Sequence, residues 1–309
     1  MFDVVSLGEL LIDFTPVLID KKILFEKNAG GAPANVAVGA SKLGLKTAFI
    51  GKVGNDGFGH FLKKTLELYK VDTSGLVIDD NFNTTLAFVE LDEKGDRSFT
   101  FVRKNGADTK LKAKELKPEI IKNTKIFHFG SLSMTDEPSF STTLKAIKMT
   151  NGLISFDPNL RKSLWKDLKL AKERILKVIK YANILKLSEE ELYFLTDISD
   201  LKKAVEHIKQ KFGTKIILIT LGEKGSFYQT KEKSGYVEAM KVNPIDTTGA
   251  GDSFLAAFLY YFISNKNFNI EEALKFANTA AAITVTRRGA IPALPTLDEI
   301  NNFKNKAPF

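Results

Sequence analysis

Short apolar runs of strand length alternate along this chain with segments in which apolar residues have helical spacing. The apolar runs lie at residues 4–7, 47–50, 126–129, 153–156, 184–187 and 216–219, and the helical segments at residues 34–43, 57–69, 168–181 and 201–212. Parallel strands need helical crossovers and are apolar on both faces, because helices cover both sides of their sheet. The pattern therefore predicts an α/β fold with a mainly parallel sheet between two layers of helices.

Two segments, at about residues 15–27 and 84–103, break this alternation. In the second segment, apolar residues from Leu86 lead through a turn at residues 93–96 to another aromatic strand, which is the pattern of a β-hairpin. We therefore expect a small lid of inserted strands. Residues 1–309 contain no internal repeat and no low-complexity linker, so we expect one domain that carries this lid.

Composition limits the chemistry that this chain can perform. It has no cysteine and three histidines, which excludes disulfides and thiol nucleophiles and argues against a Cys/His zinc site. Catalysis must then use carboxylates and backbone groups. The net charge of +8 comes with lysines spread along the expected surface helices and with no nucleic-acid-binding signature, so we expect no nucleic-acid partner.

No targeting or membrane segment is expected at the start of this sequence. The first 13 residues contain three acidic residues and lack the basic start of a secretory signal. The longest apolar stretch, at residues 254–263, is shorter than the roughly 20 residues that a membrane span needs. We therefore expect a soluble, cytoplasmic protein with no membrane partner.

The most informative segment is Asp-Thr-Thr-Gly-Ala-Gly-Asp at residues 246–252, between a strand expected to end near Val242 and a helix expected at residues 250–263. Glycines let the backbone approach a ligand closely, and the free N–H groups of a helix start attract an anion, so the loop predicts a phosphate cradle. A carboxylate there can accept the proton of an attacking hydroxyl, which is the role we expect for Asp252. The alternative is an acidic residue that only stabilises the helix start.

This loop is similar to the C-terminal signature of ribokinase-like (PfkB) sugar kinases. The N-terminal glycine signature of that family is also present at residues 28–37, and a further match follows at residues 51–59. Similarity extends from residues 8–13 to residues 277–282. The resemblance implies a Rossmann-like three-layer α/β/α fold with a β-sheet lid, the sugar beneath the lid, and ATP with Mg²⁺ beside the C-terminal helices.

The resemblance also assigns roles to individual residues. The catalytic set is Asp252 as the base, with Gly249, Ala250, Gly251 and Arg161 stabilising the transferred phosphoryl group. The sugar-binding set is Asp13, Gly30, Gly31, Asn35, Phe101 and Arg103, together with Asp252. Structural alternatives stay open for three of these residues: Asp13 as a cap, Asn35 as a partner of nearby backbone, and Arg161 as a surface arginine paired with a carboxylate.

A second set is expected on the nucleotide side, made of Lys186, Ser188, Thr220, Gly222, Gly225, Gly249, Gly251 and Asn278. Glu191 matches the glutamate of the family's Asn-x-x-Glu motif and is expected to hold Mg²⁺ through water, although Ser188 replaces the asparagine. Asp246 and Thr248 match part of a monovalent-cation site, for K⁺. The alternatives are an acidic first helical turn for residues 189–191, a plain turn for residues 220–225, and helix packing for Asn278.

Among sugar kinases the chain resembles fructokinases most, through residues 127–133, 157–161 and 186–189. We expect phosphorylation of D-fructose at the 6-hydroxyl. The alternatives are a 2-keto-3-deoxygluconate kinase, in which Arg103 would meet a carboxylate, and a non-catalytic sugar-binding relative. An aromatic lid with Phe88, Phe99 and Phe101 is expected to be covered by a second subunit, which predicts a homodimer.

Overall fold

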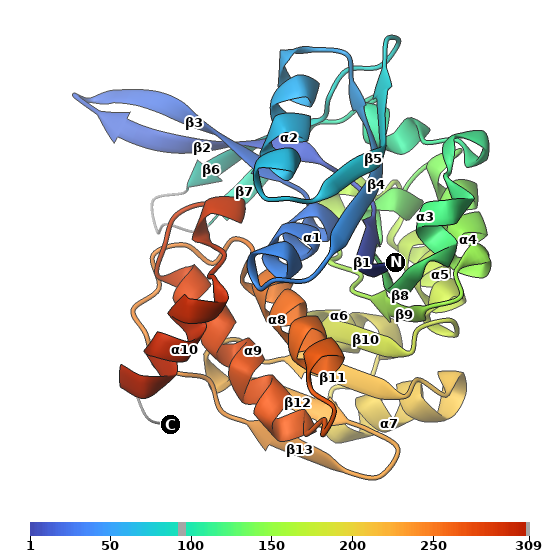
Figure 1. The fold of residues 1–309 in the computed structure, drawn as a ribbon, viewed down its shortest axis with the longest axis vertical. Coiled ribbons are helices and arrows are strands. Elements are labelled where there is room, and N and C mark those ends of the chain that lie inside the picture. Colours follow the sequence, from blue (N-terminus) through green and yellow to red (C-terminus); the bar gives the residue numbers. More distant parts are fainter. Residues whose placement is uncertain (92–96, 307–309) are drawn as a thin grey trace.

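The computed structural model describes residues 1–91 and 97–306, and its centre is a nine-stranded sheet (Figure 1). In spatial order the strands are β13 (Ser234–Val237), β12 (Ser226–Gln229), β11 (Ile216–Thr220), β10 (Ile184–Ser188), β9 (Leu153–Phe156), β8 (Thr124–Phe129), β1 (Phe2–Leu7), β4 (Thr47–Gly54) and β5 (Asp72–Asp79). All neighbouring pairs from β11 to β5 are parallel, and only β12 and β13 are added antiparallel at one edge. The predicted mainly parallel sheet is confirmed.

Helices cover both faces of this sheet because neighbouring strand residues point to opposite sides and both are apolar. In β1, Val5 packs into one core and Val4 into the other. The first face is covered by α3 (Pro118–Lys122), α4 (Ser139–Met149), α5 (Leu168–Ile179), α6 (Glu189–Thr196) and α7 (Leu201–Phe212). The second is covered by α1 (Ala32–Lys42), α8 (Ala250–Ser264) and α9 (Ile270–Val285), with α10 (Leu297–Lys306) packed on α9. The result is the predicted α/β/α arrangement.

A second sheet of four strands forms the lid, in the order β3 (Lys22–Gly30), β2 (Leu11–Ile19), β6 (Leu86–Leu91) and β7 (Arg97–Val102). The β2–β3 hairpin projects from the body of the molecule (Figure 1). At its root, a third apolar core joins the lid to α1 and to α2 (Gly57–Leu68). The lid begins earlier than expected, at Leu11, so Asp13 lies within a lid strand; the predicted turn at residues 93–96 falls outside the described residues.

Some elements differ from the sequence-based expectation. The last strand ends at Val237, and residues 238–249 reach α8 without the strand that was expected near Val242. The sequence pattern did not indicate α4, which is rich in serine and threonine; there the hydroxyls of Thr142 and Thr143 bond to carbonyl oxygens four residues earlier. Within the described ranges, no helix is both long and apolar enough to cross a membrane.

Candidate active site

Two connected chambers lie where loops follow the carboxyl ends of β9, β10 and β11, the usual ligand position of an open parallel sheet. We call them the large chamber, of about 440 Å³, and the small chamber, of about 60 Å³. The large chamber is lined by residues that follow these strands, and the small chamber by residues from the lid and the start of α1. The residues that line both are Asn159, Arg161, Thr248, Gly249 and Asp252. The predicted base therefore stands at the junction of the two chambers.

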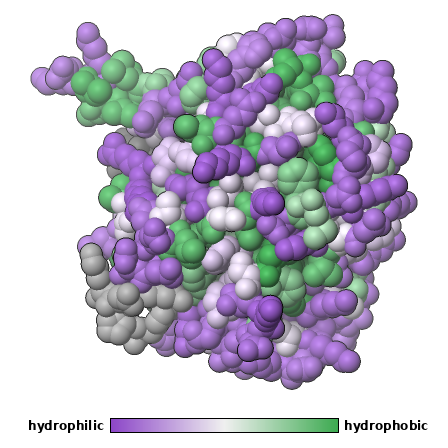
Figure 2. Space-filling view, in the orientation of Figure 1, coloured by the Kyte–Doolittle hydropathy of each residue, from purple (hydrophilic) through white to green (hydrophobic). Residues whose placement is uncertain are grey.

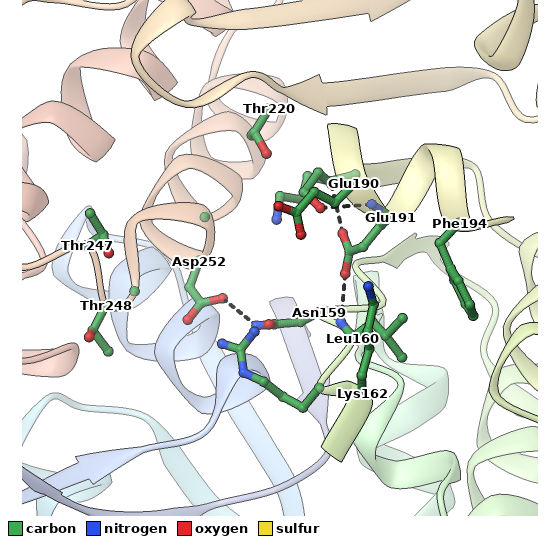
Figure 3. Close-up of a pocket in the computed structure, with 15 residues that line it drawn as sticks. Asn159, Leu160, Lys162, Glu190, Glu191, Phe194, Thr220, Thr247, Thr248 and Asp252 are labelled. Atoms are coloured by element: carbon green, nitrogen blue, oxygen red, sulfur yellow. Dashed lines mark hydrogen bonds between the residues drawn. The ribbon is translucent and has the colours of Figure 1, made fainter. Parts of the chain in front are cut away.

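Asp252 lies in the first turn of α8, which begins after Gly249 in the left-handed region at φ 78°. Asp252 is 5% exposed, and its carboxylate accepts a 2.7 Å hydrogen bond from Asn35 Nδ2. It accepts a longer one, 3.4 Å, from Asn159 Nδ2 (Figure 3). Burial raises the pKa of Asp252 to about 6, and the hydrogen bond from Asn35 opposes this shift. A carboxylate with this pKa is ionised at neutral pH and is a better proton acceptor than an exposed aspartate.

Two more carboxylates, those of Glu9 and Asp13, line the small chamber. Burial raises the pKa of each to about 7; the nearby Arg161 opposes the shift of Asp13. The glycine pair makes room for these acids: a Cβ on Gly30 would lie 2.1 Å from Asp13 Oδ2, and a Cβ on Gly31 would lie 2.3 Å from the Glu9 carbonyl oxygen. Glu9 was not predicted as a site residue; its one signal in the sequence is an acidic residue two positions after a buried strand.

Lys186, in β10, lines the large chamber and is 6% exposed. Its ammonium forms an ion pair of 2.9 Å with Asp157, which follows β9. Burial lowers the pKa of Lys186, but Asp157 and other carboxylates outweigh that effect and the net shift is upward. A Cβ on Gly251 would lie 2.9 Å from Lys186 Nζ, so this glycine lets a buried cation approach the start of α8.

The Ser188 and Glu191 pair forms the capping box of α6. Ser188 Oγ accepts the Glu191 N–H at 3.2 Å, and Glu191 Oε2 accepts the Ser188 N–H at 2.7 Å. Glu191 Oε1 accepts the Leu160 N–H at 2.6 Å (Figure 3). The structural alternative considered for this helix start is therefore present, and both residues still line the large chamber.

Asp246 anchors the loop at residues 246–252, which the sequence predicts to be a phosphate cradle. Its two carboxylate oxygens accept the N–H of Thr248 at 2.8 Å and the N–H of Gly289 at 2.9 Å, and the side chain is buried. The loop is thus tied to the segment that follows α9. Among the residues that the structure describes, no group of three or more histidine, cysteine, aspartate or glutamate side chains could hold a metal ion.

Comparison with known proteins identifies the family. The sequence profile of the pfkB family carbohydrate kinases matches residues 1–297. The chain belongs to the pfkB family of carbohydrate kinases. It is 44% identical to the probable fructokinase-7 of Arabidopsis thaliana, over 97% of this chain and 91% of that protein.

Solved structures of pfkB-type kinases have the same fold as this chain. Fructokinase from Vibrio cholerae O395, solved in its fructose, ADP and calcium ion bound form, superposes with a TM-score of 0.90 at 36% identity and covers 98% of this chain and 99% of its own. A putative ribokinase II from E. coli, solved with ATP and Mg²⁺, has a TM-score of 0.91 at 30% identity over 99% and 100% of the two chains. The ribokinase-like fold expected from the sequence is confirmed.

Other predicted residues of this pfkB kinase lie farther from the junction. Thr220 lines the large chamber, but Gly222, Gly225 and Asn278 do not. A Cβ on Gly225 would lie 2.2 Å from the Val237 carbonyl oxygen, so the backbone requires this glycine. Asn278 Nδ2 donates to the Val237 carbonyl at 3.1 Å and also to the next carbonyl, so the helix-packing role is present. Their nucleotide contacts stay predictions.

The two lid residues predicted at the sugar differ in position. Phe101 lines the small chamber, whereas Arg103 does not. Arg103 is 7% exposed, and its guanidinium donates to Asp108 Oδ2 at 2.8 Å, to Thr135 Oγ1 at 2.8 Å and to the Leu132 carbonyl at 2.9 Å. Arg103 therefore fastens the root of the lid to the body of the kinase, and this geometry does not favour a direct sugar contact.

Proposed function

We propose that this chain is an ATP-dependent fructokinase, which transfers the γ-phosphoryl group of ATP to the 6-hydroxyl of D-fructose and yields D-fructose 6-phosphate and ADP. The observation that carries the proposal is the position of Asp252, whose buried carboxylate lines both chambers. Relatives that match over nearly their whole length are named fructokinases, and one was solved with fructose and ADP. We assign the sugar to the small chamber and the phosphates of ATP to the large one.

In this mechanism Asp252 accepts the proton of the attacking hydroxyl as that oxygen approaches the γ-phosphorus. The amides of Gly249, Ala250 and Gly251 and the guanidinium of Arg161 face the charge that spreads over the phosphoryl oxygens. Asp13 and Asn35 hold other sugar hydroxyls and so orient the attack. Closure of the lid over the small chamber excludes water, which could otherwise accept the phosphoryl group.

The donor set of the large chamber fits Mg²⁺ carried by ATP. Both oxygens of Glu191 already accept backbone N–H groups, so this side chain suits contact with the water shell of the ion and not direct coordination. When bound, the ion would neutralise charge on the phosphates. The K⁺ site expected at Asp246 and Thr248 stays a prediction, as do a cytoplasmic location and the absence of a nucleic-acid partner.

The charge of the small chamber favours a neutral sugar over a sugar acid. Glu9, Asp13 and Asp252 line it, and Arg161 is the only cationic side chain among its described lining residues. A carboxylate of 2-keto-3-deoxygluconate would meet like charges, whereas the hydroxyls of fructose can donate to the three acids. Arg103, which would bind such a carboxylate, is already paired with Asp108.

We also propose a homodimer through the lid. The sequence predicted that an aromatic face of the lid forms this interface, but two of its three rings have other positions. Phe88 stacks on Phe14 with ring centroids 4.9 Å apart, and Phe101 faces the small chamber. The side chain of Phe99 is outside the described part of the chain. The exposed apolar surface lies instead on the β2–β3 hairpin, behind its polar tip (Figure 2). Its residues are Leu18, Ile19, Ile23, Leu24 and Phe25.

The Asp252→Asn variant tests the function. We expect it to bind fructose as the wild type does and to lose about 10²- to 10⁴-fold in kcat, because asparagine cannot accept the proton. ADP release is measured with fructose, 2-keto-3-deoxygluconate, ribose and a nucleoside, and sugar binding by calorimetry. Asp298→Asn is the matched control, since Asp298 is also an acid in the first turn of a helix but lines neither chamber. Undiminished turnover of Asp252→Asn would refute the base assignment.

A further inference from the structure

Glu9 has one carboxylate oxygen without a described partner. The residue lies between β1 and β2 and is 3% exposed. Its Oε1 accepts the N–H of Ala32 at 3.0 Å, and that residue is the first of α1. Its Oε2 is buried and has no hydrogen-bond partner within residues 1–91 and 97–306. Since an unsatisfied buried acceptor is unfavourable by about 1–3 kcal/mol, a ligand or water that donates to it is expected.

The side chain of Glu9 lines the small chamber together with Asn35. Asn35 donates its amide to Asp252, and its own Oδ1 is likewise buried without a partner among the described residues. Two residues that each have an unused acceptor therefore line the chamber that also contains Asp252, the proposed base. A ligand that presents several hydroxyl donors to closely spaced acceptors matches this arrangement, because each hydroxyl can donate one hydrogen bond.

Neighbouring groups do not neutralise Glu9. Arg103 is close enough to lower its pKa, but the described hydrogen bonds of that guanidinium go to Asp108, Thr135 and Leu132. Burial dominates and raises the pKa of Glu9 to about 7. A hydrogen bond from a hydroxyl to the ionised carboxylate would oppose this effect of burial, so a sugar hydroxyl at this position is favourable for both partners.

We propose that Glu9 is a specificity-determining residue, whose Oε2 accepts a hydrogen bond from one sugar hydroxyl other than the hydroxyl that is phosphorylated. The inference rests on the proposed fructokinase function and adds to it a sugar contact beyond Asp13, Asn35 and Asp252. Glu9 thereby has two roles. Its Oε1 holds the start of α1, the helix that carries Asn35, and its Oε2 binds a sugar hydroxyl. A site that hydrogen-bonds a hydroxyl discriminates against the analogue that lacks it.

The test is Glu9→Gln, which keeps a carbonyl oxygen for the Ala32 N–H but replaces the second acceptor by an NH₂ group. We expect kcat/KM for fructose to fall about 10- to 100-fold, mainly through KM, because hydrogen bonds to charged groups are of this strength. The KM for ATP should stay unchanged. In a panel of 1-, 3- and 4-deoxyfructose, the wild type should discriminate against at least one analogue, and Glu9→Gln should lose that discrimination for one analogue only.

Glu137→Gln is the matched control. Glu137 also accepts a backbone N–H with one oxygen, that of Ser141 at 3.2 Å, but it lines neither chamber. This variant should keep the wild-type kinetics. If Glu9→Gln has the fructose KM and the analogue profile of the wild type, Glu9 only caps α1 and the inference is wrong.

If Glu9→Gln does not fold, the wild type alone can still overturn the inference, provided that the panel also contains 2,5-anhydromannitol, which lacks the 2-hydroxyl. Equal efficiency of the wild-type enzyme with fructose and with every analogue would overturn the inference, while phosphorylation of fructose would still hold. A wild-type protein that does not phosphorylate fructose would overturn both. These results are distinct, so the failure of one proposal cannot be mistaken for the failure of the other.

Discussion

Asp252 is buried and accepts a hydrogen bond from Asn35, and this environment sets the pH range in which it can act. The base must be ionised, and its pKa is about 6. Asp13, in the same chamber, has a pKa of about 7. We therefore expect kcat/KM for fructose to fall as the pH drops from about 7 through about 6. Initial rates between pH 5 and pH 8 check this, and a flat profile above pH 5 would contradict it.

The raised pKa of Asp252 also affects stability, and in the opposite direction: activity is expected to rise with pH, whereas the stability of the folded state falls. The folded-state pKa of Asp252 is raised from 3.8 to about 6, so the native state binds the proton more tightly than the unfolded state and loses stability as the pH rises from about 4 to about 6. Asp252→Asn removes this effect. Above pH 7 its free energy of unfolding should exceed that of the wild type by up to about 3 kcal/mol, and at pH 4 the two should be nearly equal. Urea unfolding at both pH values measures this difference. The control Asp298→Asn should have the same free energy of unfolding as the wild type at both pH values.

Among individual residues, the sequence predicts the side chains whose spacing belongs to a motif. Asp252, Asn35 and Asp13 were predicted, and they line one chamber although Asn35 and Asp252 are 217 positions apart. Glu9 was not predicted, because a single acid after a strand has no distinctive spacing. Arg103 matches a family position at the sugar, but the sequence does not reveal that its guanidinium donates hydrogen bonds to Asp108, Thr135 and the Leu132 carbonyl.

Among the elements, the lid root depends on a buried ion pair. Arg103 Nη2 and Asp108 Oδ2 are 2.6 Å apart, and the two side chains are 6% and 2% exposed. Asp108→Asn would leave the guanidinium charge buried without its counter-charge, and we expect a loss of about 3–5 kcal/mol in the free energy of unfolding. Asp3→Asn breaks the more exposed pair of Asp3 with Lys125 and should change it by less than about 1 kcal/mol. Similar losses in the two variants, measured by denaturant unfolding, would contradict this assignment.

The elements that were predicted differ physically from those that were missed. Central strands such as β8 and β10 are buried on both faces because helices cover both, so their sequences contain short runs of large apolar residues that are distinctive. The edge strand β5 is only partly buried, and its sequence contains polar residues that hide the pattern of a central strand. Helix α4 packs threonine methyl groups while their hydroxyls bond to its own backbone, which helical propensity does not indicate.

The projecting β2–β3 hairpin predicts that two copies of the chain form a dimer. Leu18 and Ile23 are directly opposite each other on β2 and β3 and are 73% and 69% exposed. The double variant Leu18→Glu with Ile23→Lys keeps an attractive cross-strand pair but removes apolar surface. Light scattering at micromolar concentration should give twice the mass of one chain for the wild type and a single mass for the variant. A monomeric wild type would rule out this interface.

The hydrogen bond between Asn35 and Asp252 joins two residues that are 217 positions apart in the sequence. The predicted sugar contacts at residues 13–35 therefore precede the predicted proton acceptor, at the start of α8, by most of the chain. A chain that ended before α8 would contain those contacts but lack the predicted base, so we expect it to be inactive.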